Sequence, residues 1–282
     1  MNHDDTIIEN GAESIVVLSS DNNGKKSVTK HRRPHGKTQY KFEAYACEAL
    51  RSLGAKVPRV ISVSNDELVM MAFDGEIMDD QVSLYNDQTL FRLIAKDLAL
   101  NRRLRFTGFG KAIANDSPGV YHGKYSSWIE LLDITYAKLQ RSTILSNAQK
   151  SALTSHWNST ISKIKFDTGL LVHGDFALSA IFVKDRKYEG IIDFGDAFIG
   201  DPLLDLAYFR FKEITKVYGR SIYDALLDNY LEFSGLDRTY VESAVKFYMI
   251  YWAVERIHTG NLDRALIDIF IEKTDVLISE LS

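Results

Sequence analysis

The chain has 282 residues, of which 45% are hydrophobic and 26% charged, enough to bury a substantial core in one or two domains. Its formal net charge of −4 lacks the basic balance typical of nucleic-acid-binding proteins. Cys47 is the only cysteine, so no disulfide can form within the chain. No secretory signal pattern is evident, and the longest strongly apolar run, 247–254, is shorter than the roughly twenty residues of a membrane span. We therefore expect a cytoplasmic protein without nucleic-acid or membrane partners.

Four short stretches rich in aliphatic and β-branched residues predict strands, at residues 15–18, 27–30, 57–61 and 67–73. Turn-forming residues separate the members of each pair, which predicts a small antiparallel sheet. The G-x-G-x-x-G loop of protein kinases is absent, so the first pair alone would indicate only a surface hairpin. Lys30 ends the second predicted strand and is the candidate phosphate-binding lysine, although other basic residues crowd around it.

Residues 40–53 carry apolar positions at helical spacing and predict a helix. Two of its glutamates are candidates to hold Lys30 in place. Glu43 shares the apolar face with Leu50, whereas Glu48 lies on the more polar side. Because an inward-facing carboxylate is costly unless a cation meets it, the sequence favours an ion pair between Lys30 and Glu43, with Glu48 as the alternative.

The remainder of the chain is predicted to be mainly helical. Asp87 is an N-cap candidate for a helix that reaches about Leu104. Ser127 and Ser146 each have the capping-box spacing, which places helix starts directly after them. Residues 107–126 are expected to form a turn-rich excursion. Further helices are predicted at 222–233, 240–257 and 262–281.

Two carboxylates follow short predicted strands in the central part of the chain. The apolar run 170–172 leads through His-Gly to Asp175, so a strand delivers this carboxylate to a turn. Two more strands, 181–183 and 188–192, are joined by a polar turn and followed at once by Asp193. Since a hairpin brings its two ends together, we expect Asp175 and Asp193 to face the same small volume.

Phosphoryl transfer requires one carboxylate that orients the attacking hydroxyl and accepts its proton, and another that holds magnesium. In protein kinases they belong to the H-R-D-x-x-x-x-N and D-F-G motifs. This chain has His-Gly-Asp ending at Asp175 and Asp-Phe-Gly beginning at Asp193, and Ile192–Ala207 matches I-D-[FW]-x-D-A-x-x-G-D-P-x-x-D-L-A throughout. The chain therefore resembles the aminoglycoside phosphotransferase family, antibiotic kinases with the protein-kinase-like fold.

The resemblance implies an α+β, bilobal protein-kinase-like fold. Residues 1–73 would form the nucleotide-covering lobe, with an antiparallel sheet and one helix, and residues 74–282 the larger catalytic and substrate-binding lobe. The cofactors implied are ATP or GTP and Mg²⁺. The implied site residues are Asp175 as the catalytic residue, Asp193 as the metal ligand, Lys30 with Glu43 at the phosphates, and the backbone of Met71, Ala72 and Phe73 as the hinge that holds adenine. The same pattern makes His173, Asp201 and Asp205 mainly structural, with Asp205 capping or bracing the catalytic loop.

One position departs from the family pattern. Five residues after Asp175 the pattern has a side-chain amide or similar ligand, and this chain has Ala180, whose methyl group cannot coordinate magnesium. Ser179 is adjacent but would point away if the following strand had already begun. A catalytically impaired kinase or pseudokinase therefore remains an alternative.

The substrate is expected to be small. Only five residues separate Gly195 from Asp201, and no A-P-E follows, so the activation segment on which protein kinases dock a peptide is missing. The leading hypothesis is phosphorylation of an aminoglycoside-like hydroxyl; the alternative is a metabolic kinase for a choline-like or sugar-like alcohol. From Asp201 onward acidic residues outnumber basic ones, which suits a cationic or polyhydroxylated substrate but equally a solvated surface. Candidate substrate carboxylates, not separated by spacing, are Glu232, Glu242, Glu255 and Asp263.

Overall fold

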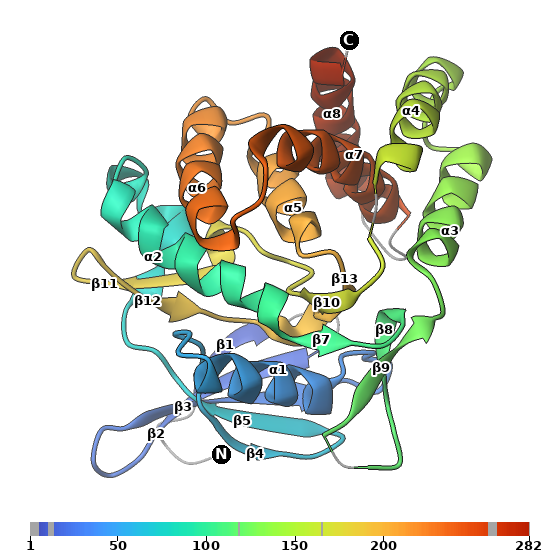
Figure 1. Ribbon diagram of the computed structural model, residues 1–282. Coiled ribbons are helices and arrows are strands. Elements are labelled where there is room, and N and C mark those ends of the chain that lie inside the picture. Colours follow the sequence, from blue (N-terminus) through green and yellow to red (C-terminus); the bar gives the residue numbers. More distant parts are fainter. Residues whose placement is uncertain (1–5, 11–13, 118, 165, 259–263, 282) are drawn as a thin grey trace.

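The computed structural model describes residues 6–10, 14–117, 119–164, 166–258 and 264–281. Figure 1 shows a small sheet-containing lobe below a larger, mainly helical one. This arrangement confirms the predicted α+β, two-lobed architecture. In the part of the chain that the structure describes, no helix is both long and apolar enough to cross a membrane.

The smaller lobe is an antiparallel sheet with one helix against it. The strand order is β1-β2-β3-β5-β4. The bounds are β1 (Thr6–Asn10), β2 (Ser14–Ser20), β3 (Lys26–Arg32), β4 (Val60–Val63), β5 (Glu67–Met71) and α1 (Tyr40–Ser52). Strand β1 was not predicted. Strand β4 begins later than predicted because Pro58 has no backbone N–H for a sheet ladder.

Two further sheets connect this lobe to the helices. One has the order β12-β11-β6 and the other β7-β10-β13-β8-β9. Their bounds are β6 (Glu76–Ile77), β7 (Arg105–Phe106), β8 (Phe109–Ala114), β9 (Tyr121–Tyr125), β10 (Gly169–Val172), β11 (Ile181–Lys184), β12 (Lys187–Ile191) and β13 (Phe198–Gly200). The turn-rich excursion expected at 107–126 contains the hairpin of β8 and β9. Strand β8 also pairs with the distant β13, a contact that the local sequence did not indicate.

Besides α1, seven α-helices are assigned within the described ranges. They are α2 (Gln88–Ala99), α3 (Trp128–Arg141), α4 (Asn147–Thr160), α5 (Leu203–Glu213), α6 (Gly219–Ser234), α7 (Arg238–Ile257) and α8 (Arg264–Leu281). The predicted N-caps are present: the side chains of Asp87, Ser127 and Ser146 each accept a backbone hydrogen bond from the first turn of their helix. Helix α2 ends at Ala99 and continues as a short 3₁₀ turn to Arg103.

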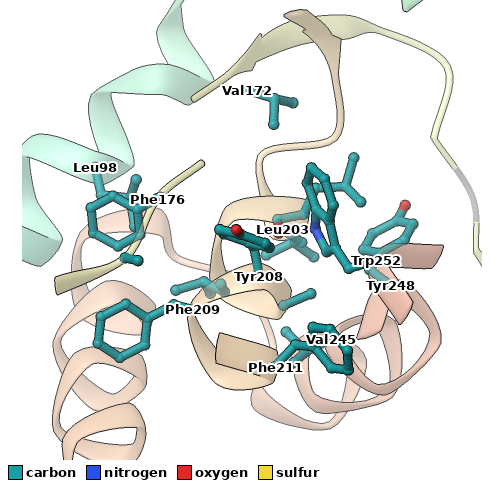
Figure 2. Close-up of a cluster of buried hydrophobic side chains, with 14 of the residues drawn as sticks. Leu98, Val172, Phe176, Leu203, Tyr208, Phe209, Phe211, Val245, Tyr248 and Trp252 are labelled. Carbon is teal, nitrogen blue, oxygen red and sulfur yellow. Dashed lines mark hydrogen bonds between the residues drawn. The ribbon is translucent and has the colours of Figure 1, made fainter. Parts of the chain in front are cut away.

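The core of the helical lobe is built around α5, which is buried on nearly all sides. Figure 2 shows side chains from α2, β10, α5 and α7 packed together there. Phe176, which directly follows Asp175, lies 5.7 Å from Phe209 between ring centroids, and Tyr208 lies 4.8 Å from Trp252. Aromatic pairs at this spacing add to the stabilisation from burial. The residue that directly follows Asp175 is thus anchored in the core.

A buried carboxylate ties three helices together under the site. Asp201, 1% exposed, accepts hydrogen bonds from the Leu203 backbone N–H and from the Tyr248 hydroxyl. The Tyr248 oxygen in turn accepts from the Trp128 indole N–H at 3.2 Å. Burial raises the pKa of Asp201 to about 6. The network links the start of α5 to α7 and α3, consistent with a structural role for Asp201.

Asp201 should make stability fall as pH rises from about 4 to about 6. Its pKa is raised in the folded state, so the folded protein retains the proton over this window and ionisation above it costs about 3 kcal/mol. Urea unfolding at several pH values measures this slope. Asp201→Asn should flatten it relative to the wild type, whereas Tyr248→Phe, which removes a donor to the charged form, should extend the fall in stability to higher pH. An unchanged slope in Asp201→Asn would contradict the assignment.

Candidate active site

The turn that carries Asp175 is shaped by its glycine. Strand β10 ends at Val172, and Gly174 adopts a φ of 86°, in the left-handed region. A Cβ at this position would lie 2.2 Å from the backbone oxygen of Asp196, closer than any side chain tolerates. The turn before Asp175 therefore packs directly on the backbone of the segment that follows Asp193. Only glycine allows that approach.

His173 and Asp205 brace this turn. The His173 Nε2 donates to the Ile192 carbonyl at 2.8 Å, and its Nδ1 accepts from the Asp175 amide at 3.3 Å. Asp205, fully buried, accepts from the His173 and Gly174 amides at 2.9 and 3.0 Å. Asp205 lies inside the first turn of α5 and braces the loop rather than capping a helix. Both nitrogens of the His173 ring therefore hydrogen-bond to backbone groups, which gives the residue a structural role.

Lys30 joins the small lobe to the segment after β12. Its Nζ lies 2.6 Å from Glu43 Oε1 and 2.6 Å from Asp193 Oδ1. Burial lowers the pKa of Lys30, but the charges of Glu43 and Asp193 outweigh it, so the pKa is raised above its ordinary value. The Lys30 charge in turn holds the pKa of Asp193 below its usual range. Both groups are therefore charged at neutral pH.

The two candidate glutamates of α1 have different environments. Glu43 is 1% exposed and pairs with Lys30, so the ion pair favoured by the sequence is present. Glu48 accepts a hydrogen bond from the Val60 amide at the surface and does not reach Lys30. The two glutamates differ because Glu43 lies on the buried apolar face of α1, whereas Glu48 lies outside it.

Asp193 has an unusual backbone conformation. Its φ of 66° and ψ of 64° place a non-glycine residue in the left-handed region. Aspartate tolerates this region better than most residues, but the conformation still costs free energy and is seen mainly where a side chain must be aimed. Here it turns the carboxylate toward Lys30 at the end of β12.

Most of the predicted site residues line one cavity of about 630 Å³. Asp175 and Asp193 both line it, as the hairpin argument predicted, and Lys30 lies on its wall. The predicted hinge residues Met71, Ala72 and Phe73 also line it, together with aliphatic side chains of β2, β3 and β5. Such an apolar slot with a few polar groups at one end is the usual form of a small-molecule site.

The hinge amides are not equally available. The Met71 N–H donates to the Arg59 carbonyl and the Ala72 N–H donates to the Lys26 carbonyl. Among the described residues, the Phe73 amide has no such backbone acceptor. Phe73 is therefore the hinge position whose N–H can serve a bound ring.

Ala180 and Ser179 both line this cavity, and the condition under which Ser179 would point away, that the following strand has begun, is not met. Residues 178–180 form a 3₁₀ turn, and the strand begins only at Ile181. The side-chain alternation of a strand therefore does not yet apply, and Ser179 is exposed toward the cavity while Ala180 is 4% exposed.

Beyond Asp175 lies a second, smaller pocket of about 210 Å³. Its acidic members are Asp196 and Glu255, and its basic member is Arg256, which donates to Asp175 Oδ1 at 2.7 Å. Sequence reasoning gave neither Asp196 nor Arg256 a role. The signal that could have found Arg256 is its i, i+4 spacing from Trp252 on α7, which places a cation over an aromatic ring.

Of the four candidate substrate carboxylates, Glu255 alone is placed beside the site by the described residues. Glu232 forms an exposed pair with Arg92, and Glu242 forms one with Arg238. Asp263 lies outside the described residues. Sequence spacing could not make this distinction, because it depends on how α7 is rotated in the fold.

The two lobes and the facing carboxylates define a small-molecule phosphotransferase with a protein-kinase-like fold. The chain belongs to the phosphotransferase enzyme family, whose model matches residues 5–241. No curated protein sequence matches it significantly.

Solved structures share this fold at low sequence identity. One is a thermostable mutant of aminoglycoside phosphotransferase APH(4)-Ia in a ternary complex with ADP and hygromycin B, with a TM-score of 0.74, 15% identity and coverage of 98% of this chain and 94% of that chain. A putative fructosamine-3-kinase from Thermobifida fusca has a TM-score of 0.68, 14% identity and coverage of 98% and 93%. The gentamicin complex of APH(2")-IIa has a TM-score of 0.62, 17% identity and coverage of 98% and 93%. These likenesses establish the fold and not the substrate.

Glu43→Gln should weaken nucleotide binding roughly tenfold, because Lys30 loses the charge that fixes it and a coupling of this size is typical of a buried charged hydrogen bond. Isothermal titration with ATP analogues measures the change. Glu48→Gln, the matched change five positions along the same helix, should leave the affinity close to the wild-type value. Equal effects of the two variants would contradict the assignment of Glu43.

Proposed function

We propose that this protein transfers the γ-phosphate of ATP or GTP to a hydroxyl group of a small polyhydroxylated, amine-bearing acceptor of the aminoglycoside type, in the cytoplasm. The observation that carries the proposal is the common cavity lined by Lys30, Asp175 and Asp193. Phosphoryl transfer depends mainly on positioning and charge stabilisation, and these three side chains are the ones it requires. The division into lobes at residues 73 and 74 is part of the same proposal, with the nucleotide between them.

The roles of the residues follow from their surroundings. Adenine would lie in the apolar part of the cavity against the Phe73 amide, with Lys30 at the α- and β-phosphates. Asp175 would accept the proton of the attacking hydroxyl, since it lies between the nucleotide cavity and the smaller pocket. Its Oδ1 accepts a hydrogen bond from Arg256, and the Tyr208 hydroxyl also interacts with this carboxylate.

Asp193 fits the requirements for binding magnesium. Its side chain is 50% exposed and lines the cavity, and magnesium typically uses one or two protein carboxylates together with substrate phosphates and water. When bound, the ion would neutralise charge on the phosphates. Among the described residues no group of three metal-ligating side chains is present.

The smaller pocket supports an amine-bearing acceptor. The carboxylate of Asp196 attracts ammonium groups, and Glu255, which is paired with Lys138, adds a second acidic group to the lining. The aromatic side chains of Phe198, Tyr251 and Trp252 form the rest of the apolar lining. Structurally similar proteins bound to hygromycin B and gentamicin support the same acceptor class, and the one with ADP supports the nucleotide.

Asp175→Asn is expected to lower turnover by about 10²- to 10⁴-fold, because the amide cannot accept the hydroxyl proton. Nucleotide affinity should change little. The assay follows transfer of labelled phosphate from ATP with magnesium to a panel of aminoglycosides, macrolides and small alcohols. Asp193→Ala serves as the comparison and should lose both turnover and magnesium-dependent nucleotide binding. Retained turnover in Asp175→Asn would remove Asp175 from its role.

A metabolic alcohol kinase is the alternative, and the likeness to a fructosamine kinase fits it. The same panel separates the two functions, because phosphorylated drug and phosphorylated sugar or amino alcohol are different products. A pseudokinase, suggested by Ala180, would bind nucleotide and phosphorylate none of the panel.

Ala180→Asn should lower the magnesium concentration required for half-maximal activity, because it adds an amide oxygen on the wall of the cavity. A magnesium titration of turnover measures this. Ser179→Ala should shift the titration in the opposite direction if the serine hydroxyl supplies the neighbouring ligand, a role that hydroxyls play in P-loop enzymes. Superimposable titrations for wild type and Ala180→Asn would show that this position does not limit metal binding.

A further inference from the structure

Arg256 is held rigidly beside Asp175 by two aromatic rings. The centre of its guanidinium lies 4.5 Å from the centroid of the Tyr208 ring and 5.2 Å from that of the Trp252 ring. These two rings are in contact with each other in the core, as Figure 2 shows. The arginine side chain is 19% exposed. Aromatic faces stabilise a cation and restrict the plane of a guanidinium, so this group has little freedom.

The same nitrogen of Arg256 contacts both the turn and the carboxylate. It donates to the Gly174 carbonyl at 3.3 Å and to Asp175 Oδ1 at 2.7 Å. The Asp175 side chain is 38% exposed and lies at the end of a turn. Among the described residues, Arg256 is the one ion-pair partner assigned to this carboxylate. The orientation of Asp175 therefore depends on a residue of α7, 81 positions downstream.

The charge balance gives a reason for this contact. Three carboxylates lie close together here, those of Asp175, Asp193 and Asp196. The pKa of Asp196 is raised, mainly because the group is buried and also because the charge of Asp175 repels its ionised form. Asp193 has Lys30 as its cation at 2.6 Å, and Asp175 has Arg256 at 2.7 Å. Each member of the reactive pair thus has a separate cation, one from the small lobe and one from the helical lobe. Without Arg256, Asp175 would face two other acids with no cation in contact.

We propose that Arg256 is a positioning residue for phosphoryl transfer, which fixes the Asp175 carboxylate in the orientation that receives the acceptor hydroxyl. The proposal rests on the proposed function, since it concerns the same reaction centre. A misplacement of about 1 Å at such a centre can reduce the rate about 10²-fold. Lysine would not replace arginine fully, because an ammonium lacks the planar group that the rings of Tyr208 and Trp252 enclose.

Arg256→Ala should lower kcat about 10²-fold and leave the KM for the nucleotide nearly unchanged, because Arg256 does not line the nucleotide cavity. Arg256→Lys should retain an intermediate rate. Millimolar guanidinium chloride, far below denaturing concentrations, should restore activity to Arg256→Ala by entering the vacated slot between the rings. Ammonium chloride at the same ionic strength should not. Restoration would also show that the variant is folded.

Arg92 provides a matched control. It too pairs with a carboxylate, Glu232, and lies over an aromatic ring, Phe233 at 4.9 Å, but on the outer surface of α2. Arg92→Ala should keep the wild-type kcat and show no response to guanidinium. A loss of activity in both variants, or restoration by any salt, would point to a general effect of removing an arginine and would overturn the proposal.

A crystal structure of Arg256→Ala, with and without guanidinium, tests the proposal independently of turnover. The Asp175 carboxylate should adopt a different or mixed orientation in the variant and return to its wild-type orientation when guanidinium is bound. An unchanged orientation without guanidinium would overturn the positioning role. If the wild type phosphorylates no acceptor in the panel, the proposed acceptor class fails, and this structural comparison still decides the role of Arg256.

Discussion

The contact on which the site depends is the double ion pair of Lys30 with Glu43 and Asp193. It joins a strand of the small sheet, a helix packed on that sheet and the loop after β12 through one ammonium group. Breaking a buried pair by removing one partner typically costs about 3–5 kcal/mol, because the remaining charge is left without compensation. The Lys30 end of the cavity is therefore fixed by an interaction that joins β3, α1 and the loop after β12.

The helical lobe solves a related problem for Asp175. A carboxylate at the tip of a turn would be mobile, and here the Asp175 amide donates to His173, Asp205 holds the two preceding amides, and Arg256 holds the side chain. Gly174 lets the turn lie against the backbone of Asp196, so the two carboxylate-bearing segments cannot move independently. Asp175 is thus supported by backbone contacts from one side and, through Arg256, by the tilted rings of Tyr208 and Trp252 from the other.

The smaller pocket combines acidic, basic and aromatic groups within a few residues of Asp175. This mixture suits an acceptor with several hydroxyl and amino groups better than a simple apolar alcohol. Neighbouring residues of α7 have different partners here, because Arg256 donates to Asp175 while Glu255 accepts hydrogen bonds from Thr135 and Lys138. Substrate selection would then be open to change without disturbing the reaction centre.

The sequence by itself determined the class of fold, the strand and helix pattern around the two aspartates, the capping serines and the choice of Glu43 over Glu48. These features are local, since periodicity, capping and short motifs act within a few residues. The β8–β9 hairpin, the orientation of Ser179, the choice of Glu255 among four acids and the contact of Arg256 with Asp175 were decided only by the tertiary structure. Each depends on how distant elements are rotated and packed against one another, and a side chain 81 positions from its partner leaves no trace of that contact in sequence spacing.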